Sequence, residues 1–168
     1  MIVRFASSLT RSDQELAAGA GLDSLLTLCL SQLGVSGSGV GCRLTTSAEV
    51  RGLNRRFAGL DRATDVLAFP AAPIPGSEFQ IPQAEAGYLG DLVISVRYAA
   101  RQAERAQADP SAELRLLAVH GLLHLLGHDH AGPKPASRMT RETRRLLSVD
   151  AAQRGMAAPP VPALQSQE

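Results

Sequence analysis

The chain has 168 residues, of which 45% are hydrophobic, and its formal net charge is +1. This length suits one domain, and a high apolar content with so little net charge excludes a largely disordered chain. Two cysteines are too few for a disulfide framework, and no apolar run approaches the roughly 18 residues of a membrane span, so we expect a soluble cytoplasmic protein without a membrane partner.

Apolar runs and helical periodicity divide the chain into strands and helices. Strands are expected over residues 2–5, 42–45, 65–69 and 88–96. Helices are expected over residues 12–33, 46–57, 95–108, 110–126 and 137–149, with Gly19 and Gly21 as points where the first can divide. The elements predict a single α+β domain over residues 1–150, with about four strands and five helices, and a disordered tail over residues 151–168.

The segment 110–126 carries the strongest helix signal in the sequence. Asp109 is a good N-cap, and Pro110 suits the first helical position. The helix behind them is apolar nearly all round, which is typical of a helix in the middle of a core.

All four histidines fall within residues 120–130. His120 and His124 are four residues apart on the expected helix, so their imidazoles share one face. Gly127 follows where the helix must end, and a glycine there allows a sharp turn that can bring His130 back as a third ligand. The spacing therefore predicts a metal site formed by His120, His124 and His130.

Three imidazoles leave a fourth coordination position open, as in catalytic zinc sites. We expect one Zn²⁺ per chain, although Ni²⁺ or Cu²⁺ would also suit such ligands. A cation of this kind supplies a nucleophile from water at neutral pH, which predicts a hydrolase or a phosphodiester-cleaving enzyme. His128 could close the fourth position or point outward as a proton-transfer group, and Asp129 is a candidate general base.

The same histidine spacing occurs in metzincin peptidases, which place a glutamate directly after the first histidine as the general base. Here that position is Gly121, and this departure argues against peptide hydrolysis. A metzincin-like peptidase or another small metallohydrolase is kept as the alternative enzyme.

Three segments together resemble one known family: residues 53–70, 89–95 and 120–130 are similar to the motifs of the YbeY family of bacterial ribosomal-RNA maturation endoribonucleases. The resemblance covers roughly residues 42–147. It implies a small mixed sheet with the metal-binding helix in its core, and His120, His124 and His130 as metal ligands. It also implies a single-strand-specific endoribonuclease in 16S rRNA 3′-end maturation and ribosome quality control, whose partners are single-stranded RNA, rRNA and the ribosomal small subunit.

The sequence departs from that family at Ala58, where the family has a functional arginine. Arg55 and Arg56 lie nearby and are candidate RNA-binding residues, although such arginines also suit a solvated helix face. Asp65 and Asp91 occupy strand positions in the matched motifs and could orient a ligand histidine or cap a turn. Because of Ala58, a non-catalytic ribosome-assembly factor that zinc merely stabilises remains a further alternative.

Overall fold

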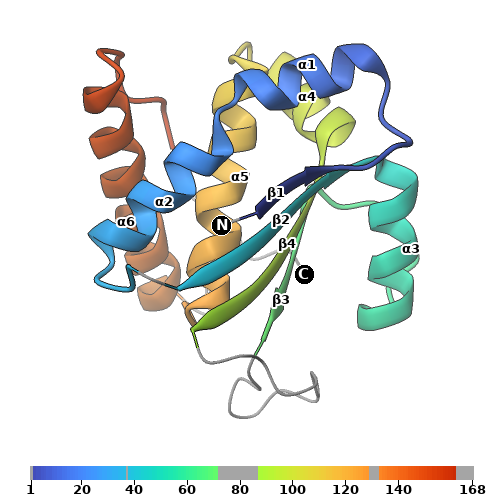
Figure 1. Ribbon diagram of the computed structural model, residues 1–168, viewed down its shortest axis with the longest axis horizontal. Coiled ribbons are helices and arrows are strands. Elements are labelled where there is room, and N and C mark those ends of the chain that lie inside the picture. Colours follow the sequence, from blue (N-terminus) through green and yellow to red (C-terminus); the bar gives the residue numbers. More distant parts are fainter. Residues whose placement is uncertain (1, 37, 72–86, 129–132, 162–168) are drawn as a thin grey trace.

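A four-stranded mixed sheet organises the fold, as the computed structural model shows for residues 2–36, 38–71, 87–128 and 133–161 (Figure 1). The strand order is β1-β2-β4-β3. The strands are β1 (Ile2–Phe5), β2 (Gly39–Thr45), β3 (Val66–Pro70) and β4 (Tyr88–Ser95). β1, β2 and β4 run parallel, whereas β3 pairs antiparallel with β4 at the sheet edge. The expected strand number and mixed sheet are confirmed.

Six helices lie in the part of the chain that the structure describes. They are α1 (Arg11–Gly19), α2 (Leu22–Gln32), α3 (Ser47–Ala58), α4 (Val96–Arg105), α5 (Pro110–Leu125) and α6 (Pro133–Gln153). The first expected helix divides at Gly21, whose φ of 59° is left-handed and suits glycine. The α+β class is confirmed.

The start of β2 differs from the expected strand over residues 42–45, which left a Gly/Ser-rich turn before it. The strand begins at Gly39, where pairing with β4 replaces the local turn preference. A Cβ on Gly39 would lie 3.0 Å from Cδ2 of Tyr88, so glycine permits the close approach of the two strands. Strand pairing between distant segments decided this boundary.

The two faces of the sheet are covered differently. Cys42 and Leu44 of β2 belong to the main core, together with the buried side chains of α5. Arg43 points to the opposite face, because successive strand residues alternate, and its Nε donates to Glu49 of α3 (2.8 Å). α3 therefore packs on the other side of the sheet from α5, and it stands apart from α2, α5 and α6 in Figure 1.

α5 lies in the core, as its apolar sequence predicts. It packs against the sheet, α2, α4 and α6. A buried ion pair fixes its position: the Arg115 guanidinium donates to Asp150 of α6 and to the carbonyl of Ala20. The helix that carries His120 and His124 is thus held on several sides.

The C-terminal helix extends beyond the expected domain boundary at residue 150. α6 continues to Gln153, and Val161 is buried in the core, where its carbonyl accepts a hydrogen bond from Arg144 (3.3 Å). Part of the expected tail, residues 162–168, lies outside the described residues. None of the described helices combines the length and the apolar character needed to cross a membrane.

Candidate metal centre

The structure brings His120 and His124 together on one face of α5. Their Nε2 atoms are 3.1 Å apart, and their ring centroids are 4.7 Å apart at an interplanar angle of 83°. The helix that sets this spacing is capped by Asp109, whose side chain accepts from the backbone N–H of Ser111 (3.0 Å). Two ring nitrogens are therefore directed at one point beside the helix.

That separation of the two nitrogens fits a shared cation. Two imidazole nitrogens that bind one tetrahedral cation at about 2.0–2.1 Å each stand about 3.3–3.4 Å apart. The observed 3.1 Å between the Nε2 atoms of His120 and His124 is only slightly shorter. Neutral imidazoles suit Zn²⁺, Ni²⁺ or Cu²⁺, so the donor set present accommodates the ions expected from the sequence.

The third expected ligand, His130, and the candidate base, Asp129, lie outside the described residues. Consequently, no group of three His, Cys, Asp or Glu side chains within the described part of the chain forms a complete ligand set. The turn before them is described: Gly127 has a φ of 81°, and its N–H donates to the carbonyl of His124 (2.9 Å). The helix ends at the glycine, as the sequence predicts.

His128 follows the turn that ends α5, and its backbone N–H donates to the carbonyl of Leu123 (3.0 Å). The two expected alternatives for its side chain, a fourth ligand or an outward proton-transfer group, both stay predictions.

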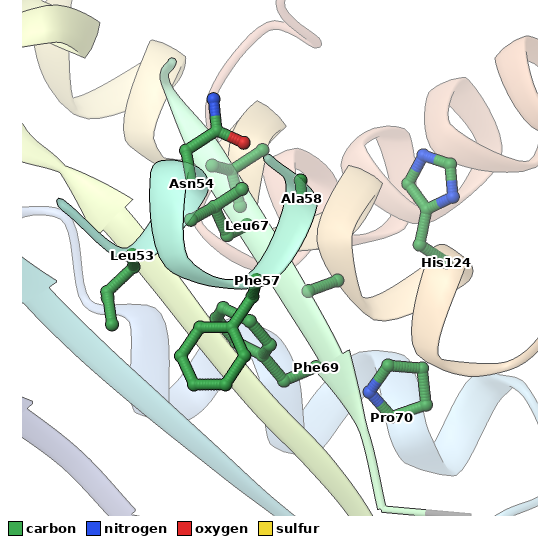
Figure 2. Close-up of a pocket in the computed structure, with 10 residues that line it drawn as sticks. Leu53, Asn54, Phe57, Ala58, Leu67, Phe69, Pro70 and His124 are labelled. Carbon is green, nitrogen blue, oxygen red and sulfur yellow. The ribbon is translucent and has the colours of Figure 1, made fainter. Parts of the chain in front are cut away.

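A groove adjoins His124, one of the two paired histidines (Figure 2). Its volume is about 370 Å³, and its walls come from α3, β3 and α5. The lining residues are Leu53, Asn54, Phe57, Ala58, Val66, Leu67, Ala68, Phe69, Pro70 and His124. We call this cavity the His124 groove. It runs along β3, the strand at the edge of the sheet, and it gives a ligand access to one of the two histidines.

The arginines of α3 lie outside the lining of this groove. Arg55 and Arg56 are exposed, and the guanidinium carbon of Arg56 lies 5.1 Å from the centroid of the Phe57 ring. Arg51 is committed to Asp61 through two hydrogen bonds of 2.8 and 2.9 Å. The structure thus places Arg56 next to a groove residue and shows no such contact for Arg55, whereas an arginine in place of Ala58 would lie within the groove.

Asp65 and Asp91 have structural partners. The carboxylate of Asp65 accepts from the N–H of Val66 (2.8 Å) and from Gln102 (3.1 Å), so it caps the start of β3 and links it to α4. Asp91 accepts from the hydroxyl of Tyr88 (2.7 Å); burial and this carboxylate together raise the pKa of Tyr88 to about 12. For Asp65 these contacts favour the turn-capping alternative, whereas Asp91 bonds to Tyr88 within its own strand, β4.

Gly121 marks the close approach of α5 to the sheet. A Cβ at this position would lie 2.8 Å from Cδ2 of Leu92 and 3.2 Å from Cγ2 of Val66. Leu92 is fully buried, so a glutamate side chain has no room here. The position that carries the general base in metzincins therefore faces the core and not the histidines.

Phe57 and Phe69 are the groove residues that reasoning from the sequence did not assign to a site. They are twelve positions apart and come from a helix and a strand, yet their rings meet edge to face at a centroid distance of 5.3 Å. The available signal was an aromatic residue directly after two arginines at the end of an expected helix. The partner strand could not be found from sequence spacing.

Comparison with known proteins identifies relatives along most of the chain. The family described as endoribonuclease YbeY matches residues 10–149. Proteins named endoribonuclease YbeY are similar in Chloroflexus aurantiacus (42% identity; 67% of this chain, 73% of that one) and in Thermus thermophilus (41%; 74% and 85%). The solution structure of TM1509 from Thermotoga maritima has a TM-score of 0.60 at 22% identity, covering 98% of this chain and 100% of that one, which supports the fold.

Proposed function

The chain belongs to the YbeY endoribonuclease family, and from this premise we propose that it is a metal-dependent, single-strand-specific endoribonuclease of 16S rRNA 3′-end maturation and ribosome quality control. The observation that carries the proposal is the His120–His124 pair, with Nε2 atoms 3.1 Å apart beside a groove. Its expected partners are single-stranded RNA, rRNA and the ribosomal small subunit, which place it in the cytoplasm.

One Zn²⁺ per chain, or Ni²⁺ or Cu²⁺ in its place, would be held by His120, His124 and His130. The third histidine follows Gly127 by three positions in the sequence, which supports its inclusion. When bound, such a cation polarises phosphate oxygens and makes water acidic enough to provide a nucleophile near neutral pH.

The remaining groups position the RNA strand. The His124 groove is lined mostly by apolar side chains and opens beside His124, so it can receive part of an RNA strand. Arg55 and Arg56, which are exposed on α3, would bind backbone phosphates. Asp129 adjoins the third histidine in the sequence and is the proposed acceptor of the proton that the attacking water loses.

The proposal is tested with His124→Ala and His128→Ala. His124→Ala removes one of the two paired nitrogens, so we expect bound metal, measured by elemental analysis, and cleavage of single-stranded RNA both to be lost. Association with the small subunit should largely survive. His128→Ala is the matched control and should keep metal and activity, because His128 is not one of the three proposed ligands.

Each alternative predicts a different result. A non-catalytic assembly factor would leave wild type and His124→Ala equally inert toward RNA, and removing the metal would simply unfold it. A peptidase would degrade casein when loaded with metal. Retained RNA cleavage by His124→Ala would refute the assignment of that histidine.

A further inference from the structure

We propose that Phe57 and Phe69 form a stacking platform for an unpaired nucleobase, which fixes the register of an RNA strand against His124. The inference rests on the endoribonuclease function above and adds a binding subsite to it. Its starting point is the position of an exposed aromatic side chain. Phe57 is 42% exposed although it is large and apolar, and it lies on the last turn of α3, next to the groove.

The platform is held in place from two elements. The ring of Phe57 meets that of Phe69 at 5.3 Å with an interplanar angle of 69°, an edge-to-face geometry that aromatic pairs prefer. Phe69 is anchored in β3, where it pairs with Asp91 of β4. An aromatic ring braced in this way loses little conformational freedom when a planar ligand binds.

The chemistry of the His124 groove selects the ligand. Among the described residues that line it, none is a lysine, an arginine or a carboxylate. Asn54 contributes an amide, but its Nδ2 already donates to the carbonyl of Arg62 (2.9 Å). A phosphate would gain little from these walls, whereas a flat, weakly polar group would gain from stacking. A nucleobase is such a group.

One cation is shown beside the platform. The guanidinium carbon of Arg56 lies 5.1 Å from the centroid of the Phe57 ring. A base that stacks on the pair would therefore have this cation close to its own phosphate. Proteins that bind single-stranded nucleic acid combine these two features, aromatic stacking and a positive path for the backbone.

The arrangement also explains a preference for unpaired RNA. In a duplex both faces of a base are stacked on neighbouring pairs, so an aromatic side chain cannot reach them. Binding to the platform requires a base that can leave its stack. Single-strand specificity would then come from Phe57, and cleavage from the neighbouring histidines.

The test uses fluorescence, because the chain has no tryptophan. Phe57→Trp introduces one indole at the platform, and its fluorescence is measured as RNA is added. Three RNAs are compared: a short oligoadenylate, the same strand with an abasic site in each position, and a duplex. We expect oligoadenylate to quench the indole and the abasic strand not to. Equal quenching by both strands would overturn the proposal.

Affinity is measured separately by fluorescence anisotropy with Phe57→Ala and Phe57→Leu. We expect both to bind oligoadenylate about 5- to 140-fold more weakly, since leucine restores apolar volume but offers no π face. Duplex affinity should not change. Phe5→Ala is the matched control, because Phe5 is also 42% exposed but lies on β1, at the opposite edge of the sheet from β3. Unchanged oligoadenylate affinity in Phe57→Ala would refute the platform.

The outcomes separate this inference from the proposed function. If wild type cleaves RNA and Phe57→Ala binds and cleaves equally well, the platform is wrong and the function stands. If wild type cleaves no RNA while the base-dependent quenching is present, the function is wrong and the platform stands. An indole that responds to an extended apolar peptide and not to RNA would make the groove a peptide site and overturn the proposal.

Discussion

Replacing Arg115 with methionine should lower the free energy of unfolding by about 3–5 kcal/mol, the usual cost of removing one partner from a buried ion pair. The side chains of Arg115 and Asp150 are only 6% and 9% exposed, and Arg115 Nε donates to Asp150 Oδ2 at 3.1 Å. Arg115→Met leaves a buried carboxylate and the Ala20 carbonyl without this donor. In a domain of this size the loss corresponds to a fall in Tm of about 6–20 °C.

The measurement is urea unfolding followed by circular dichroism. Arg154→Met is the control, because Arg154 is 39% exposed and lies 3.8 Å from the same carboxylate, so its removal should cost less than about 1 kcal/mol. The double variant Arg115→Met/Asp150→Leu should recover part of the loss, since it no longer buries a lone charge. The reasoning fails if Arg115→Met is no less stable than Arg154→Met, or if the double variant is no more stable than Arg115→Met.

Two further predictions concern α3 and α5. Gly52→Ala should raise the free energy of unfolding by about 0.5–1 kcal/mol, because alanine favours the helix and nothing lies within 4 Å of the added Cβ. Gly121→Ala should lower the free energy of unfolding, because the added Cβ overpacks the core at a cost of about 1–3 kcal/mol, which exceeds the gain in helix propensity. Thermal melts that shift in the same direction for both would contradict this. Arg55→Ala/Arg56→Ala should weaken binding to single-stranded RNA and flatten the slope of log affinity against log salt by about 1.4, the contribution of two phosphate contacts. Arg11→Ala, on the distant α1, is the control. An unchanged slope in the double variant, or an equal flattening by Arg11→Ala, would argue against Arg55 and Arg56 as RNA-binding residues.

Local chemistry in the sequence was enough to predict the central helix and the histidine pair. Asp109 and Pro110 mark the start of α5, and its observed bounds follow them. Two histidines four positions apart on any α-helix share a face, so the proximity of His120 and His124 depends on nothing outside that helix. The three family motifs also predicted the endoribonuclease function, because a match to them depends only on the identity and the order of residues in the sequence.

Contacts between distant segments were beyond such reasoning. The start of β2 depends on its register with β4, and the pairing of Arg115 with Asp150 depends on how α6 packs against α5. The meeting of Phe57 with Phe69 required β3 to occupy the sheet edge beneath α3. No periodicity within either segment encodes that position.

The sequence by itself therefore determined the class of fold, the central helix and the face on which two imidazoles meet. Only the tertiary structure decided which walls surround His124, that α3 lies across the sheet from α5, and that Gly121 faces Leu92 and the core. The physical reason is the range of the interactions. Helical repeat and capping act over a few residues, whereas a groove is formed by elements whose relative positions are set by burying their apolar faces together.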